Sequence, residues 1–299
     1  MLQRVMTSLP QVGLAVKPPT RKKFGPPGGG RASLHPLFVV KWLSRRKGPA
    51  TVSGHSKWHN IRIKKEKVDA QKGRTFTRLA REIIAAAKQG GGNPDINSRL
   101  RSALQRAREV GMPQDSIKRG VQRGTGEIAG FSYEEVTYEG YGPGGVAILV
   151  EAVTDNRKRT VSELRALFSK AGGNLGESGC VAWMFESKGV ILLDRKLVDE
   201  EALLELALDA GAEDIRTSDT THEILTPPAR LEAVKQALIQ RNLAPESAEV
   251  TMVAKSSVPV SGKVAEHVLR LMEALEDQED VQKVHANFDI PDSVLEAAA

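Results

Sequence analysis

The chain has 299 residues, of which 40% are hydrophobic, and this length suits two or three domains of ordinary size. No apolar run approaches the roughly 18 residues that a membrane helix needs, which argues against a membrane-spanning protein. The single cysteine, Cys180, excludes an internal disulfide, and the alternating apolar residues around it predict a buried, inert thiol.

The net charge of +6 is distributed unevenly along the chain. Residues 1–53 carry ten Lys or Arg and no acidic residue, and residues 54–125 carry seventeen basic and six acidic residues. Residues 126–299 carry sixteen basic and thirty-one acidic residues. A basic N-terminal part joined to an acidic body indicates binding to nucleic acid or another anionic surface.

Residues 1–53 have the composition of an organelle transit peptide. Arginines are scattered among Leu, Val and Ser, acidic residues are absent, and no compact apolar core of a secretory signal appears. The alternative is a disordered basic tail that binds nucleic acid directly, which Pro26-Pro27 and Gly28-Gly29-Gly30 favour. We expect import into an organelle followed by cleavage at an undetermined position.

Residues 54–129 are predicted to form a basic helical domain that binds RNA. Apolar residues at helical spacing predict a first helix from Arg74 to Gly90, a second at Asn97–Val110 and a short third helix after Pro113. Each helix also carries a basic stripe. Such stripes are usually solvated faces, but three successive helices of the same sign favour phosphate binding. Contact with about six phosphates of a single strand would give a salt slope of roughly −4.

The candidate RNA-binding residues combine a polar tip with rows of phosphate-binding side chains. Trp58 could stack on an unpaired base or simply anchor its segment to the helical bundle. The complete predicted set is His55, Ser56, Lys57, Trp58, Asn60, Arg62, Lys64, Lys65, Lys67, Lys72, Arg74, Arg78, Arg81, Lys88, Arg99 and Arg101.

Neither a metal nor a cofactor is expected. His55 and His59 have i, i+4 spacing, but no cysteine or acidic ligand lies near them in sequence, which argues against zinc. Residues 140–145 satisfy G-x-G-x-x-G, yet the strand expected at Val146–Val153 follows where a dinucleotide site needs a helix. We therefore predict a turn with positive φ angles, or alternatively a loop that approaches RNA or protein closely.

The rest of the chain predicts two α/β domains, so the fold class is α+β. One domain comprises residues 130–187 plus 256–294 and is interrupted by residues 188–255, whose strand-helix-strand-strand-helix-strand order predicts a ferredoxin-like sandwich. The expected elements are Glu135–Glu139, Val146–Val153, Arg157–Ala171 with a capping box at Thr160 and Glu163, Gly179–Glu186, Val190–Leu193, Glu200–Ala210, Asp214–Arg216, Glu223–Thr226, Ala229–Gln240, Ala248–Val253, a helix with Val264, Val268, Leu271, Met272 and Leu275 inward, and Val281–Phe288.

Several ordered motifs resemble the YebC/PmpR family over everything from about Gly54 to the C-terminus. They are Gly54-His55-Ser56-Lys57-Trp58, Asp69-Ala70 with Lys72-Gly73, Gly90-Gly91-Gly92-Asn93-Pro94-Asp95, Asn97 with Arg99-Leu100-Arg101, Tyr138-Glu139-Gly140-Tyr141-Gly142-Pro143-Gly144-Gly145, Asp155-Asn156-Arg157 and Gly172-Gly173-Asn174-Leu175-Gly176. The chain departs from many relatives at His59 and Ile63. The resemblance implies two ferredoxin-like domains, one inserted in the other, behind the helical domain.

With its basic leader the chain resembles the mitochondrial branch of that family, the translational activators of cytochrome c oxidase subunit I. The resemblance implies a protein of the mitochondrial matrix that binds messenger or ribosomal RNA and the mitochondrial ribosome, and relieves stalling at difficult, proline-rich sequences. The alternative is a DNA-binding transcriptional regulator, as some bacterial relatives are described. No small-molecule substrate is expected. No enzyme is expected either, because the polar segment Asp155–Thr160 lacks an accompanying catalytic set.

Overall fold

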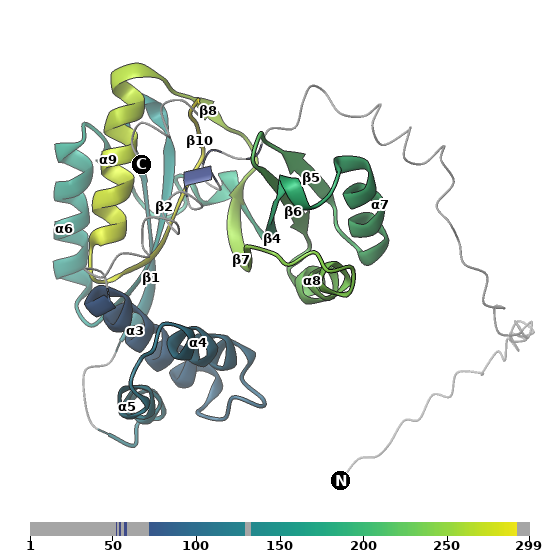
Figure 1. Ribbon diagram of the computed structural model, residues 1–299. Helices are drawn as coiled ribbons and strands as arrows, with labels where there is room; N and C mark the ends of the chain where they lie inside the picture. Colours follow the sequence, from purple (N-terminus) through teal and green to yellow (C-terminus); the bar gives the residue numbers. More distant parts are fainter. Residues whose placement is uncertain (1–51, 53, 55–56, 59–71, 129–132, 292–299) are drawn as a thin grey trace, which may run out of the picture. The chain divides into compact units, whose positions relative to one another are not determined.

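The computed structural model describes residues 52, 54, 57–58, 72–128 and 133–291 (Figure 1). All of them belong to one compact unit that spans residues 46–299. It combines helices with two four-stranded antiparallel sheets, which confirms the α+β fold class. None of the described helices combines the length and the apolar character needed to cross a membrane.

Three helices make the basic N-terminal domain: α3 (Lys72–Gly90), α4 (Ser98–Glu109) and α5 (Gln114–Thr125). Helices α3 and α4 begin and end within two residues of their predicted bounds, and α5 begins directly after Pro113, as predicted. Buried apolar side chains from all three form one core: Leu79, Ile83, Ala86, Ala87, Leu100, Ala103, Leu104, Ala107, Met112 and Ile117.

Two kinds of contact fix the arrangement of these helices. Asn97 caps α4 by accepting a hydrogen bond from the amide of Leu100, and its side-chain nitrogen donates to two carbonyl groups at the end of α3. Gly120 and Gly124 let α5 approach α3 closely, because a Cβ atom at Gly124 would lie 2.5 Å from the Cβ of Ala87. The glycine face of α5 therefore points inward, and its basic residues point outward.

The first α/β domain has a four-stranded antiparallel sheet in the order β3-β1-β2-β9. Its strands are β1 (Glu134–Tyr141), β2 (Ala147–Thr154), β3 (Asn174–Leu175) and β9 (Val281–Ala286). Helices α6 (Arg157–Lys170) and α9 (Gly262–Asp277) lie side by side on this sheet (Figure 1). A short parallel pair joins β8 (Val258–Pro259), which precedes α9, to β10 (Phe288–Asp289), which follows β9.

The second α/β domain occupies the chain between β3 and α9. Its sheet has the order β5-β6-β4-β7, and every pair is antiparallel. The elements are β4 (Phe185–Asp194), α7 (Glu200–Ala210), β5 (Asp214–Thr217), β6 (Thr221–Thr226), α8 (Leu231–Gln240) and β7 (Ser247–Ala254). This order is that of the predicted ferredoxin-like sandwich, and because β9 then returns to the first sheet, the second domain interrupts the first.

The glycine-rich connection between β1 and β2 is a turn, as predicted. It forms the short 3-10 helix η2 (Pro143–Gly145), in which Gly144 has φ 72° and Gly145 has φ 77°. These values lie in the left-handed region that favours glycine. Strand β2 follows directly, so the helix that a dinucleotide site requires is absent at this point of the described chain.

Three local predictions were wrong. The N-cap of α6 is Asn156, which accepts a hydrogen bond from the amide of Arg159, so Thr160 and Glu163 lie inside the helix and form no capping box. Val264 is 39% exposed and does not face inward. Residues 179–184 form a loop and the 3-10 helix η3 (Ala182–Met184) instead of a strand, because the Glu139 carboxylate engages three amide groups that a neighbouring strand would otherwise bind.

Candidate nucleic-acid interface

Half of the predicted RNA-binding residues lie where side-chain structure is not described. His55, Ser56, Asn60, Arg62, Lys64, Lys65 and Lys67 are outside the described residues, and Lys72 is described only as the first residue of α3. Their predicted contacts with RNA remain predictions. The described candidates are Lys57, Trp58, Arg74, Arg78, Arg81, Lys88, Arg99 and Arg101.

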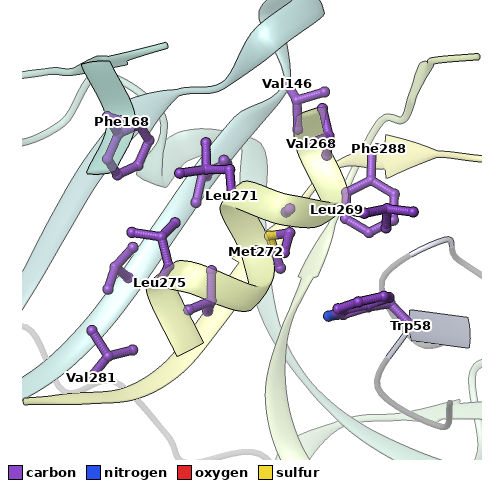
Figure 2. Packing of buried hydrophobic residues seen from close by; sticks show 14 of the residues in the cluster. Trp58, Val146, Phe168, Val268, Leu269, Leu271, Met272, Leu275, Val281 and Phe288 are labelled. Atoms are coloured by element: carbon purple, nitrogen blue, oxygen red, sulfur yellow. The ribbon is translucent and has the colours of Figure 1, made fainter. Parts of the chain in front are cut away.

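Trp58 is buried in the core of the first α/β domain. It is 7% exposed and clusters with apolar residues that include Leu269 and Phe288 (Figure 2). Its neighbour in sequence, Gly54, also lies against Phe288, since a Cβ atom at Gly54 would lie 2.4 Å from the Phe288 carbonyl oxygen. The structure favours the anchoring alternative over base stacking, but the anchor is the α/β domain and not the helical bundle.

The arginine row on α3 faces the carboxyl-terminal end of α9. Arg74, Arg78 and Arg81 are spaced so that they share one face of the helix. The Arg74 guanidinium lies 3.1 Å from the Asp277 carboxylate, and Arg78 donates a hydrogen bond to the Glu276 carbonyl. Free carbonyl groups and negative charge at a helix C-terminus attract cations, which accounts for this contact.

Arg81 reaches deepest into this contact. Its side chain is 10% exposed, donates to the Glu279 carbonyl and lies 3.3 Å from the carboxylate of Asp280. Sequence spacing had placed Arg81 on an exposed phosphate-binding stripe. In the structure its charge is matched by a carboxylate inside the protein, so contact with phosphate would require this pair to open.

Asp280, the buried partner of Arg81, also contacts residues of α6. It is 1% exposed and lies 3.0 Å from the Arg159 guanidinium and 2.8 Å from the Thr160 hydroxyl. Burial acts to raise the pKa of Asp280, but the hydrogen bonds from Thr160 and Arg159 and the charge of Arg81 outweigh it, so the pKa lies below its ordinary value. The hydrogen bond to Asp280 in turn raises the pKa of Arg159. Asp280 is therefore a buried anion that joins α3 to α6.

Three further candidates also bind within the protein. The Lys88 ammonium donates to the Tyr133 carbonyl at 2.9 Å, and Arg99 forms an ion pair with Glu135 at 2.5 Å. Arg101 donates to the Pro94 carbonyl at 2.9 Å. Their side chains remain exposed at the surface, unlike that of Arg81, so phosphate could still reach them.

Helices α4 and α5 carry further basic side chains that are exposed. They are Arg108, Lys118, Arg119 and Arg123, which we call the outer face. None of the four forms a salt bridge with another described residue. The sequence predicted a basic stripe on each of the three helices, but these four residues were not among the candidate site residues.

The described residues contain no group of three or more His, Cys, Asp or Glu side chains arranged to hold a metal ion. Cys180 is half-buried, and burial raises the pKa of its thiol. The candidate site consists of exposed basic side chains on a helical domain, which precedes two α/β domains in the chain.

Comparison with known proteins identifies the family. Residues 56–127 match the family model of the TACO1/YebC protein N-terminal domain, and residues 133–288 match that of the TACO1/YebC second and third domain. The chain therefore belongs to the TACO1/YebC family, which confirms the resemblance to YebC/PmpR proteins.

Bacterial relatives resemble the chain over almost their whole length. A protein of Dictyoglomus turgidum, named "Probable transcriptional regulatory protein", is 57% identical over 247 residues, which are 82% of this chain and 99% of that protein. A protein of the same description from Geobacter sulfurreducens is 52% identical over 82% of this chain and 99% of its own length. The crystal structure of a conserved hypothetical protein from Aquifex aeolicus has a TM-score of 0.67 and 48% identity, covering 75% of this chain and 92% of that one.

Proposed function

We propose that the protein is a regulator of gene expression that acts by binding nucleic acid through its helical domain, without catalysing a reaction. The observation that carries the proposal is the outer face, where four exposed basic side chains lack carboxylate partners among the described residues. Arg and Lys bind phosphate strongly, and each phosphate they neutralise releases counterions. The acidic α/β domains would limit indiscriminate binding.

The names of the relatives favour regulation of transcription, and hence DNA as the target. The sequence spacing shows no clear helix-turn-helix, but one local feature of the structure supports this form of the proposal. Helices α4 and α5 are joined by four residues, Val110–Pro113, in which Gly111 has φ 77°. Helix-turn-helix units use turns of this length that often contain glycine, and they place the second helix in the major groove. Here that helix would be α5, which carries three members of the outer face.

Activation of translation in mitochondria is the second candidate, and residues 1–53 favour it. This basic, acid-free segment precedes the residues that match the family model, which begin at residue 56. Its composition is that of a transit peptide. In this form the partner would be messenger or ribosomal RNA on the mitochondrial ribosome, the location would be the matrix, and the supported product would be cytochrome c oxidase subunit I.

Binding measurements at several salt concentrations test the proposal. The native protein, the Arg119→Glu/Arg123→Glu variant and a matched Lys196→Glu/Arg241→Glu variant on the second α/β domain would each be titrated with duplex DNA and with unstructured RNA. All four substituted side chains are exposed, so the variants should fold. We expect only the α5 variant to lose binding. Equal binding by all three proteins would refute the proposed interface.

The preferred binding target distinguishes the transcriptional form of the proposal from the translational form. Tighter binding to duplex DNA, without co-sedimentation with mitochondrial ribosomes, would support the transcriptional form. Salt-sensitive co-sedimentation that the α5 variant loses would support the translational form.

A further inference from the structure

Two aromatic side chains are exposed beside each other on the first α/β domain. Trp183, in η3, is 65% exposed, and Tyr141, at the end of β1, is 36% exposed. The Tyr141 hydroxyl and the Trp183 indole nitrogen both donate to the Cys180 carbonyl, at 3.0 and 3.2 Å. Because their polar atoms are satisfied at one oxygen, the two rings are neighbours whose apolar surfaces remain open to solvent.

The loop that carries Trp183 is held rigidly from beneath. Glu139 is 4% exposed, and its carboxylate accepts hydrogen bonds from the amides of Gly179, Val181 and Ala182 at 2.6 to 2.7 Å. Burial acts to raise the pKa of Glu139, but these three hydrogen bonds lower it below its ordinary value, so the carboxylate stays ionised at neutral pH. The exposed indole is therefore pre-organised, which reduces the entropy lost when a ligand stacks on it.

A positive charge lies beside the indole, and residues near the two rings in sequence are exposed. The Lys255 ammonium donates to the Trp183 carbonyl at 2.9 Å and places a positive charge at the base of the indole. Gly144 and Gly145 are exposed and have no side chains, while Glu177 and Ser178 are exposed in the loop before Cys180.

We propose that Trp183 and Tyr141 form a stacking platform for unpaired bases of a single-stranded nucleic acid. This inference rests on the proposed function and adds a second contact surface, outside the helical domain. Every nucleobase has a flat face that can stack on an aromatic ring, whereas a duplex keeps those faces inside the helix. The Lys255 ammonium supplies charge for the adjoining phosphate.

Substitution of the indole tests the platform in the full chain. We would titrate Trp183→Ala, Trp183→Phe and native protein with a fluorescein-labelled unstructured RNA and with a duplex of equal length. Ile239→Ala, which removes another exposed apolar side chain, is the matched control. We expect Trp183→Ala to bind the single strand about tenfold more weakly and the duplex unchanged, with Trp183→Phe retaining most of the affinity.

Tryptophan fluorescence provides a second readout that a merely structural role would not produce. In a Trp42→Phe background, the single strand should quench the emission of exposed Trp183, while buried Trp58 is unaffected.

Two results would overturn the inference. If Trp183→Ala binds the single strand like native protein while Arg119→Glu/Arg123→Glu does not, the proposed function stands and the platform is wrong. If native protein binds no nucleic acid, both proposals fail.

Discussion

The α3 arginine row and the outer face of α4 and α5 contain the same residue types in one small domain, yet their environments differ. Arg74, Arg78 and Arg81 contact the end of α9 and the residues that follow it, whereas Arg119 and Arg123 point to solvent. The partners of the row lie about 200 residues further along the chain. A basic stripe in a sequence therefore shows where positive charge lies, but not whether other groups of the same protein already neutralise that charge.

Removal of Asp280 should have the largest effect on stability. Asp280→Ala leaves Arg81 and Arg159 without their buried carboxylate, and loss of one partner of a buried pair costs about 3–5 kcal/mol. Urea unfolding measures this cost. Glu279→Gln is the control, because its carboxylate is 77% exposed and should contribute less than about 1 kcal/mol. Similar losses for both variants would show that the contact is not buried in solution.

Loss of Arg81 should cost less than loss of Asp280. In Arg81→Met the Asp280 carboxylate keeps Arg159 and Thr160, so only one charged hydrogen-bonding partner disappears. We expect the free energy of unfolding to fall by about 1.5–3 kcal/mol. Arg78→Met, which removes the hydrogen bond to the Glu276 carbonyl, is the companion variant and should lose less. An equal loss for Asp280→Ala and Arg81→Met would mean that Arg159 contributes nothing.

The Asp280 carboxylate makes the free energy of unfolding depend on pH. A group whose native pKa is lowered stabilises the fold only while it is ionised, so the contribution of Asp280 is complete above its unfolded pKa of about 4. It is lost as pH falls through the native value. Urea unfolding of native protein and Asp280→Asn across this range should therefore differ most at neutral pH and converge in acid. A constant difference would contradict the lowered pKa.

Among the variants of the α3 row, Arg74→Ala should have the smallest effect on stability. Its ion pair with Asp277 joins side chains that are 60% and 42% exposed, and pairs of this kind contribute about 0–1 kcal/mol. Substitutions on the outer face, which have no described partner, should change stability by no more than about 0.5 kcal/mol. Thermal melts of Arg74→Ala and Arg119→Ala, measured together, would test the expected small losses for the α3 row and for the outer face.

Elements with strong local signals could be predicted from the sequence. Helix α7 spans Glu200–Ala210 as expected, because acidic residues at its start and Gly211, at φ 105°, mark both ends. The strand order of the second α/β domain followed from the alternation of elements. Residues 179–184 could not be predicted, since their apolar alternation is that of a strand and the Glu139 carboxylate that reshapes them lies 40 residues earlier.

The candidate site was predictable in location but not in detail. Sequence identified the helical domain, its three helices and their basic character. It could not show that Trp58 packs beside Phe288 or that Arg81 binds Asp280, because both contacts depend on the chain returning from more than 190 residues away. Charge and aromatic character are local properties, whereas burial is decided by tertiary packing.

The salt dependence of nucleic-acid binding tests most directly the claim that the outer face, and not the α3 row, is the interface. Fluorescence anisotropy of a labelled duplex and a labelled RNA would be measured from about 50 to 200 mM salt with native protein, Arg119→Ala/Arg123→Ala and Arg74→Ala. We expect the double variant to lower the salt slope by about 1.4–1.8 and Arg74→Ala to leave it unchanged. A slope that falls for Arg74→Ala but not for the double variant would contradict the account.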